Sequence, residues 1–522
     1  MIVSILDCTL RDGGYINNWE FPKKQAIKII NALNSSNVDI VELGYLDDKN
    51  GKVNDSTLFS SIKSINDLIG DIGRDFNKVV MINLFDFDVS KLPQQSKTKI
   101  DGIRLAFHKE NAEEALIQAQ TITDLGYKLF FQPMVTKNYS DDEFVSIMQK
   151  SNQLKAHAFY IVDSFGSMSL KDFKKYIKLA NDCLQDEVCL GFHSHNNMQL
   201  AFSNAIELCA ANFDREVIID SSVYGMGRGA GNLNTELITN YLNDQVHKKY
   251  NVLPLLEVID ETLTFYFKKS PWGFSPAQYL SASLDCHPNY ASYLVNKKTT
   301  HIADIQEVLE KIPLNKKVSF DEKIVDDLYQ QFLLKSKSEV QGKISIPTGK
   351  KILLIASGHS VIDNLKAIKH KVESENYFVI ALNHKPQFDC DYYFFSNQQR
   401  FDEFKESLLT ERLAITSNIK CDELIDVVID LSDVVYIGGS FITNVTMLMI
   451  NYLISQDIQK IEIAGLDGYQ MGRDNYAYDE TQVSDNLNLF IELNQAVENS
   501  LMELKLLTNI ELITPSVYEN IL

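Results

Sequence analysis

The 522-residue sequence has no uninterrupted apolar stretch of the ~18 to 20 residues that a membrane-spanning helix needs. Its most apolar window, residues 445–454, is short and contains Thr446 and Asn451. The first residues also lack the basic segment and apolar run of a secretory signal, and they predict a strand instead. We therefore expect no membrane span and a cytoplasmic protein.

The sequence has fewer positive than negative side chains, with 50 lysines and arginines and 70 aspartates and glutamates, which gives a formal net charge of −20. This balance argues against a nucleic-acid-binding protein and against attraction to anionic lipid. It does not exclude anionic small substrates, which a local arginine or metal ion can hold. The seven cysteines include no CxxC pair, so reduced thiols are a simpler expectation than a disulfide framework.

The composition, with 45% hydrophobic and 23% charged residues, is that of a globular protein, and the length predicts two or three domains. Up to about residue 245, short apolar or β-branched runs alternate with amphipathic segments such as 22–34 and 112–125. Eight such runs predict a (β/α)8 TIM barrel rather than a doubly wound sheet. They cover residues 2–6, 39–43, 78–84, 102–105, 129–132, 159–162, 188–192 and 217–221.

Beyond this barrel domain, 1–245, the pattern changes. Residues 246–335 predict a helical extension, and the polar stretch 336–350 predicts a linker. Residues 351–522 predict a second, smaller Rossmann-like α/β domain that begins with a buried strand in KILLIASGHS (351–360). Further strands are expected at 377–383, 391–395, 434–437 and 460–464, and a helix is expected at 444–455.

Charged and polar residues lie at the ends of several predicted barrel strands. The carboxyl ends of barrel strands converge on one mouth, so residues far apart in sequence are expected to meet there. The residues concerned are Asp7, Arg11 and Asp12 of the first unit, Glu42 of the second, Arg104 and His108 of the fourth, and Asp163 and Ser164 of the sixth.

The segment GFHSHNN (191–197) places His193 and His195 two residues apart, so both side chains point to one face of a strand. Two imidazoles with a carboxylate from another strand end suit a divalent metal. An isolated HxH is more often a pair of exposed or hydrogen-bonded histidines, but its place at the seventh strand end favours a metal site.

A glycine-rich loop, YGMGRGAGNLNTE (224–236), follows the eighth run, with glycine at every second position from Gly225 to Gly231. Such a loop lets backbone approach a ligand closely and can offer amides to an anion. Spaced glycines alone are more often a tight turn. Asn232 adds a carbonyl oxygen that could reach the same mouth.

Six motifs, DCTLRDGG, VELGY, GIRLAFH, IVDSFGSMS, GFHSHNN and GMGRGAGN, follow one another between residues 7 and 232. In this order they resemble the DRE-TIM metallolyase (HMGL-like) superfamily, and the chain is most similar to its 4-hydroxy-2-oxovalerate aldolase members. The resemblance covers under half the chain. It implies a metal-dependent carbon–carbon lyase that makes or breaks a bond beside a 2-oxo acid, such as pyruvate, with an aldehyde as partner.

The resemblance also implies roles for individual residues. A divalent metal, manganese or magnesium and less readily zinc, would be held by Asp12, His193, His195 and Asn232. Arg11 would neutralise the enolate oxygen, because a guanidinium cannot give up its proton here and acts only through charge. Asp7 and Glu42 would orient Arg11 or a metal-bound water, and Glu42, Arg104 and Ser164 are the substrate-binding residues that we predict.

The sequence departs from the aldolase pattern at Tyr15, where those enzymes carry a histidine base. A phenol with an ordinary pKa near ~10 is a poor base at neutral pH. Two assignments stay open: Tyr15 relays a proton, or His108 takes over.

In the carboxyl-terminal domain, ASGHSV (356–361) joins a strand to an expected helix, where a nucleotide phosphate could bind backbone amides. Together with VYIGGSFITNVTMLMINYL and IEIAGLDGY it resembles sialyltransferase-like and pterin-pyrophosphokinase-like Rossmann domains. A structural or oligomerising domain and a nucleotide or nucleotide-sugar site are equally open. The contacts for the second alternative are Gly358, Ser360, Asn383, Gly439 and Asp467, and a fusion of this kind would suit bacterial surface-sugar biosynthesis.

Other activities fit parts of the same pattern. A Claisen-type synthase that uses an acyl-CoA could share the barrel, and two histidines with one carboxylate are also the ligands of non-haem iron oxygenases. A non-catalytic barrel is a further alternative. Whether the chain forms a homo-oligomer is left open by the sequence.

Overall fold

A computed structural model describes residues 2–522, apart from 53–54, 71–75, 212, 246–248, 298–299, 375, 423–424, 472–474 and 478–486. The chain divides into two compact units, Met1–Ser292 with Pro313–Phe320, and Tyr293–Ile312 with Asp321–Leu522. The four-part division expected from the sequence stays a prediction, and its first boundary, 245/246, borders residues outside the described part.

The first unit is a closed barrel of eight parallel strands, so the predicted fold is confirmed. The sheet runs β1-β9-β8-β7-β6-β5-β4-β2, and pairing of β1 with β2, with Leu6 opposite Ile40, closes the circle. Its strands are β1 Val3–Asp7, β2 Ile40–Leu46, β4 Asn77–Asn83, β5 Gly102–Phe107, β6 Lys128–Pro133, β7 Ala158–Asp163, β8 Cys189–Ser194 and β9 Val217–Ser221, with a short β3 Leu58–Phe59 beside β2.

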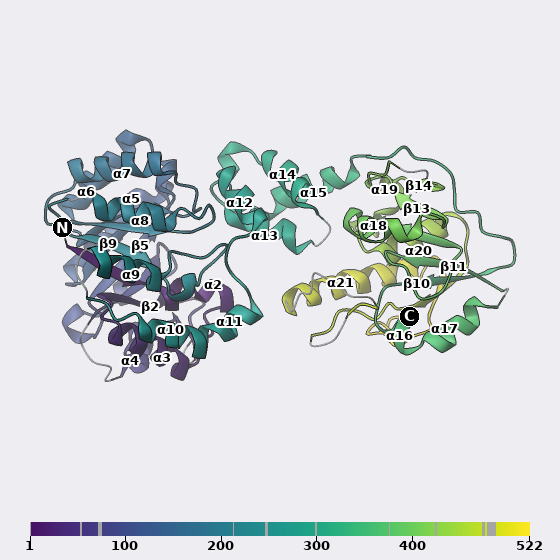
Figure 1. Cartoon of the computed structure of the whole chain (residues 1–522), viewed down its shortest axis with the longest axis horizontal. Coiled ribbons are helices and arrows are strands. Elements are labelled where there is room, and N and C mark those ends of the chain that lie inside the picture. The colour runs from purple at the N-terminus through teal and green to yellow at the C-terminus, as the bar shows by residue number, and fades with distance from the viewer. Residues whose placement is uncertain are drawn as a thin grey trace. The chain divides into compact units, whose positions relative to one another are not determined.

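Helices surround this barrel, several of them visible on its outside in Figure 1. They are α1 Thr9–Asp12, α2 Gly14–Asn17, α3 Lys23–Ser35, α4 Ile62–Ile69, α5 Ala112–Asp124, α6 Asp141–Gln153, α7 Leu170–Cys183, α8 Ala201–Ala210 and α9 Thr235–Gln245. The helical segment that follows contains α10 Leu253–Val258, α11 Thr264–Lys269, α12 Pro276–Ser283, α13 Pro288–Asn296, α14 Ile302–Glu310 and α15 Glu322–Leu334.

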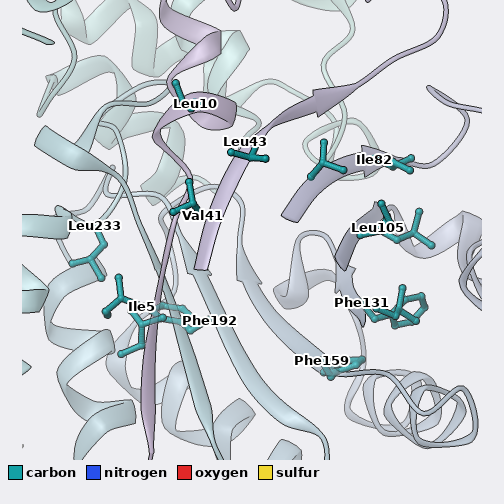
Figure 2. Close-up of a cluster of buried hydrophobic side chains, with 14 of the residues drawn as sticks. Ile5, Leu10, Val41, Leu43, Ile82, Leu105, Phe131, Phe159, Phe192 and Leu233 are labelled. Atoms are coloured by element: carbon teal, nitrogen blue, oxygen red, sulfur yellow. The ribbon is translucent and has the colours of Figure 1, made fainter. Parts of the chain in front are cut away.

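The barrel strands are buried on both faces, which explains why they read as nearly continuous apolar runs. Alternate residues face opposite sides. Ile5, Val41 and Phe192 belong to the layer between strands and helices, part of which Figure 2 shows. Leu6 and Ile40 belong to a separate cluster inside the barrel, so this alternation decides which polar side chains point toward its axis.

The second unit contains a seven-stranded parallel sheet with the order β14-β13-β12-β11-β10-β17-β18. The strand order reverses at β10, where ligands bind in many open α/β sheets. The strands are β10 Lys351–Ile355, β11 Tyr377–Leu382, β12 Tyr392–Phe395, β13 Leu413–Thr416, β14 Val427–Ile429, β17 Lys460–Ala464 and β18 Asn509–Leu512. Besides α14 and α15, the helices of this unit include α16 Ser360–Asp363, α17 Leu365–Val372, α18 Gln398–Phe404, α19 Leu431–Val434, α20 Val445–Ser455 and α21 Leu487–Leu504.

One predicted strand of this unit, 434–437, is wrong in large part. Helix α19 ends at Val434, and only β15 Tyr436–Ile437 is extended, paired with β16 Ser440–Phe441. Asp430 caps the helix by accepting a hydrogen bond from the Ser432 amide, a local signal that outweighs the β-branched composition of the segment.

Candidate active site

Four charged side chains point into the barrel because they occupy inward positions of their strands. Asp220 follows the inward Ile218 by two residues on β9, and Glu42 follows the inward Ile40 on β2. His193 and Arg104 lie on β8 and β5 and meet the same groups. All four are buried, so they must neutralise one another or a ligand.

Arg11 and Arg104 share one carboxylate. Glu42 Oε2 lies 2.8 Å from Arg11 Nε and 2.9 Å from Arg104 Nη1. Arg104 also pairs with Asp220 through Nη2. Arg11 Nη1 lies 2.9 Å from Asp12 Oδ1, whereas Arg11 Nη2 is buried without a hydrogen-bond partner among the described residues. The guanidinium of Arg11 is thus held on two sides and has one free donor edge.

His193 is oriented by a carboxylate. Its Nδ1 lies 2.9 Å from Asp220 Oδ2. Burial raises the pKa of Asp220, but Arg104 and the hydrogen bond from His193 outweigh burial and leave it below its ordinary value. Because an ionised carboxylate only accepts, Nδ1 carries the proton and Nε2 presents its lone pair. That Nε2 lies 3.6 Å from Asp12 Oδ2.

Asp12 lies among these groups. Burial acts to raise the pKa of Asp12, but the positive charge of Arg11 outweighs burial, so the pKa lies well below its ordinary value. The side chain is 0% exposed, and neither of its oxygens makes an aligned hydrogen bond to a described residue, although Oδ1 has its ion contact with Arg11. Buried carboxylate oxygens without donors suit a cation.

His195 and Asn232 complete the group. The rings of His193 and His195 are 5.4 Å apart, and His195 forms an isolated antiparallel bridge with Asn232. Burial lowers the pKa of His195 to about 3, so its imidazole is neutral and free to act as a ligand. Asn232 donates to the Met226 carbonyl at 3.2 Å, while its buried Oδ1 has no partner among the described residues.

These donors fit a divalent metal: the oxygens of Asp12 and the amide oxygen of Asn232 are buried without a hydrogen bond to a described residue, and an imidazole nitrogen of His193 lies beside Asp12. Ligand atoms of Cys8, Asp12 and His193 lie within 4.8 Å of one another, and His195 lies outside this tight group. Burial raises the pKa of the Cys8 thiol, which instead donates to the Ser221 carbonyl at 3.2 Å. The structure thus favours the nitrogen and oxygen ligands over the thiol.

The two glycines of the first motif permit close packing. A Cβ at Gly13 would lie 2.4 Å from the Thr9 carbonyl oxygen and 2.8 Å from Met226 Sδ. A Cβ at Gly14 would lie 2.1 Å from the ring of Trp19. Glycine therefore lets the loop that carries Arg11 and Asp12 lie against its neighbours.

Tyr15 lies in the short helix α2 after β1, and His108 lies in the loop after β5. Tyr15 exposes 43% of its surface and packs against Trp19, with ring centroids 4.7 Å apart. Crowding around its hydroxyl group raises its pKa above the ordinary value, although Arg228 and Arg11 act in the opposite direction. His108 is half-buried directly after β5.

Ser164 and Asp7 both make hydrogen bonds to neighbouring segments of the barrel. Ser164 Oγ accepts a hydrogen bond from the Val135 amide at 3.0 Å, so it fixes a neighbouring loop. The prediction that Asp7 orients Arg11 or a metal-bound water is wrong. Asp7 accepts from the Thr9 amide at 2.9 Å and from the Thr235 hydroxyl at 2.6 Å, because it follows the inward Leu6 and points outward.

Sequence reasoning missed three residues of the site: Asp220, Arg228 and Asn197. Asp220 could have been found as a lone carboxylate inside the apolar run VIIDS. Asn197 bridges two loops, since Nδ2 donates to the Phe165 carbonyl and Oδ1 accepts from the Ala230 amide. Nothing in the sequence around Arg228 indicated a binding residue, because the neighbouring glycines predict only a tight turn.

The residues predicted for a nucleotide site fall into separate places. Ser360 donates through its amide to Asp467 at 2.7 Å and pairs with it through its hydroxyl, and Gly358 lies against the same aspartate. Asn383 follows β11 and lines a cavity with Ser396 and Asn418. Gly439 lies in the turn between β15 and β16. Gly358, Ser360 and Asp467 form one group at the point where the strand order reverses.

Comparisons with known proteins match the part of the chain that forms the barrel. The HMGL-like family model matches residues 2–261. A 4-hydroxy-2-oxovalerate aldolase of Bacillus thuringiensis (strain Al Hakam) is 24% identical over 264 residues, which are 50% of this chain and 76% of the relative. One from Geobacillus genomosp. 3 is 27% identical over 246 residues, covering 46% and 70%. The solved N-terminal domain of a proposed aldolase from Bacteroides vulgatus is 28% identical, with a TM-score of 0.49, and the match covers 56% of this chain and 96% of that one.

None of the helices in the described part of the chain combines the length and apolar character that a membrane crossing requires.

Proposed function

Because residues 2–261 belong to the HMGL-like family of the DRE-TIM metallolyase superfamily, and the protein is thus a carbon–carbon lyase, we propose that it joins a pyruvate enolate to an aldehyde or releases the two. One observation carries the proposal most directly. Arg11 Nη2, a free buried donor, lies beside the unsatisfied oxygens of Asp12 and the free Nε2 of His193.

In this proposal Asp12, His193, His195 and Asn232 hold manganese or magnesium, with zinc less favoured by the oxygen-containing ligand set. When bound, the ion supplies a Lewis acid for the oxygens of the 2-oxo acid. Asp220 keeps the protonated Nδ1 of His193 turned away from that ion.

Arg11 stabilises the enolate. Glu42 and Asp12 fix two sides of its guanidinium, so the third edge is already oriented when negative charge develops on the enolate oxygen. A donor oriented in advance in a dry site stabilises the transition state more than the ground state. Arg104, paired with Glu42 and Asp220, keeps the carboxylate partner of Arg11 in place.

When the new bond forms, Tyr15 donates its proton to the aldehyde oxygen and is reprotonated from solvent, which also takes up the proton that pyruvate loses on enolisation. Its raised pKa keeps the phenol protonated at neutral pH, which suits a donor rather than a base. His108 is the alternative group for this transfer.

The test follows the methyl protons of pyruvate. Metal-loaded protein incubated with pyruvate in deuterated water should exchange them, as seen by NMR, and Arg11→Lys should slow the exchange at least about 100-fold. Lysine retains the positive charge but not the planar set of donors that lets a guanidinium bind partners on three sides. Wild-type protein that binds manganese but gives no exchange would refute the proposal.

Two parallel assays address the other activities. Release of free thiol from acetyl-CoA with a 2-oxo acid would identify a Claisen-type synthase. Oxygen uptake with ferrous iron and 2-oxoglutarate would identify an oxygenase. The present proposal expects neither.

The second unit carries a separate proposal of nucleotide or nucleotide-sugar binding, in line with a role in bacterial surface-sugar biosynthesis. Its support is the group Gly358, Ser360 and Asp467 where the strand order reverses. Asp467 already accepts from the Ser360 amide, so an incoming phosphate must displace this carboxylate. Calorimetric titration with nucleoside monophosphates and diphosphates tests it, and absence of binding by all of them contradicts it.

A further inference from the structure

Arg228 extends from the glycine-rich loop after β9, at the same mouth as the metal-binding group. The loop is held firmly: Asn197 Oδ1 accepts from the Ala230 amide at 2.9 Å, and the Arg228 carbonyl accepts from the Gly231 amide at 3.1 Å. Gly229 has a φ of +66° and no room for a Cβ, which would lie 2.7 Å from Asn197 Oδ1. The base of the Arg228 side chain is therefore fixed in position.

The guanidinium of Arg228 lacks the partners that the other arginines of this mouth have. Arg11 contacts Asp12 and Glu42, and Arg104 contacts Glu42 and Asp220. Arg228 is half-buried, yet it forms no ion pair or side-chain hydrogen bond with any residue in the described ranges. Its one specific contact is with the ring of Tyr15, 5.3 Å from the centroid. The charge of Arg228 contributes to the lowered pKa of Asp12, but Asp12 pairs directly with Arg11 and not with Arg228, so the half-buried guanidinium can still receive an anion.

His287, just before α13, packs its ring against Phe165 with the centroids 5.7 Å apart, and Asn197 links Phe165 to the loop of Arg228. His287 Nδ1 accepts a hydrogen bond from the Asn289 amide at 3.2 Å, so the proton of the neutral ring is on Nε2. Burial lowers the pKa of His287 to about 3, and Arg228 and His108 act in the same direction, so the ring is neutral and can donate from Nε2.

We propose that Arg228, assisted by His287, forms a subsite for a carboxylate or phosphate that the aldehyde partner carries at the end remote from its carbonyl group. The inference rests on the proposed aldolase function and specifies its substrate class. In the proposed function Arg11 and the metal-binding residues take the 2-oxo acid, which leaves Arg228, in contact with the ring of the proton donor Tyr15, for the aldehyde partner. A planar guanidinium binds either anion through two parallel hydrogen bonds.

The experiment compares matched aldehydes with pyruvate as donor. One pair is butanal and 4-oxobutanoate, which differ by a carboxylate, and the other is glyceraldehyde and its 3-phosphate. For wild-type protein the ratio of kcat/KM, anionic over neutral, should exceed 1 by about 10- to 100-fold in at least one pair, the range that a charge-assisted pair supplies. Which pair shows it distinguishes carboxylate from phosphate.

Arg228→Gln should lower that ratio by about the same factor, and Arg228→Lys should restore part of it. Lys137→Gln is the matched control, because it removes one positive charge from the same end of the barrel where Asp285 already neutralises it. The ratio should stay within about twofold of wild type in this control. Manganese affinity, measured for each variant, reports whether the site is still folded.

Three results would overturn the inference. The wild-type ratio could be near 1 in both pairs, or it could be unchanged in Arg228→Gln. Arg228→Gln could instead raise KM for pyruvate in the deuterium-exchange assay by the same factor, which would assign the guanidinium to the carboxylate of pyruvate. Failure of the aldolase proposal is distinguishable, because wild-type protein would then not exchange pyruvate protons at all.

Discussion

At the scale of single residues, Asp220 determines which nitrogen of His193 faces the metal-binding group. Asp220→Asn can place an amide hydrogen toward Nδ1 and so favours the wrong tautomer. Because such supporting partners typically contribute 10- to 100-fold to metal affinity, we expect a loss of about that size in a manganese titration followed by EPR.

Cys8 provides the control for this measurement. Its thiol donates to the Ser221 carbonyl, a contact that a serine hydroxyl can reproduce. Cys8→Ser should therefore bind manganese within about twofold of wild type. An affinity loss in Cys8→Ser as large as in Asp220→Asn would mean that the thiol is a ligand and that the tautomer argument fails.

Asp7 links stability to pH. Burial raises its pKa to about 6, although hydrogen bonds from Thr235 and Thr9 oppose the shift. Between the unfolded pKa near ~4 and about 6 the folded state binds more protons than the unfolded state, so the free energy of unfolding falls as pH rises through this window. The loss attributable to Asp7 is on the order of 2 to 3 kcal/mol.

Asp7→Asn should remove this share of the pH dependence, as measured by denaturant unfolding between pH 4 and pH 7. Asp163, whose pKa burial also raises to about 6, should retain its own share and leave a residual slope. An unchanged slope in Asp7→Asn would contradict the assignment.

Individual residues also mark the limit of sequence reasoning. Asp12 and His193 could be placed together from the strand count, because both follow barrel strands at the same end. The sequence could not tell that Asp7 points outward, since its carboxylate is one residue out of phase with the inward Leu6. Nor could the sequence identify Arg228 as a binding residue, because that assignment depends on its having no ion-pair partner among the described residues.

At the scale of elements, α1 and α2 depend on two adjacent glycines. Gly13→Ala adds a methyl group 2.4 Å from the Thr9 carbonyl oxygen, although the backbone φ of −61° suits alanine. We expect destabilisation by ~1 to 3 kcal/mol from overpacking and a weaker manganese site, both measurable by calorimetry.

Gly439→Ala is the contrasting variant, with a φ of +81° and no heavy atom within 4 Å of the added Cβ. It should cost only the ~1 kcal/mol of a left-handed backbone and leave manganese binding unchanged. Equal stability of Gly13→Ala and wild type would show that the loop can shift away from Thr9.

The eight barrel strands could be predicted because each is long, buried on both faces and followed by a helix. In the second unit β13, β14 and β18 escaped prediction, whereas β12, also of four residues, was predicted because its run Tyr392–Phe395 is entirely aromatic. The prediction for 434–437 was wrong because the β-branched composition of the segment competes with the capping residue Asp430. Short strands are thus predicted only where their composition is strongly typical of strands.

At the scale of the whole molecule, a metal bound only by the barrel should stabilise only the first unit. Manganese at about 100 times its dissociation constant should add ~2.7 kcal/mol to the free energy of unfolding of that unit. Differential scanning calorimetry with manganese and with EDTA should move the transition of the first unit and leave that of the second unit in place. Equal shifts of both transitions would contradict a single site in the barrel.

The central claim is that Asp12 and the imidazoles of His193 and His195 hold one metal ion. Pulsed EPR of the manganese-loaded protein tests it most directly, because each coordinated imidazole adds a nitrogen coupling to the manganese signal. We predict couplings from two imidazoles in wild type, one in His195→Gln, and markedly weaker binding in Asp12→Asn. Manganese bound without nitrogen coupling, or with undiminished affinity in Asp12→Asn, would contradict the account.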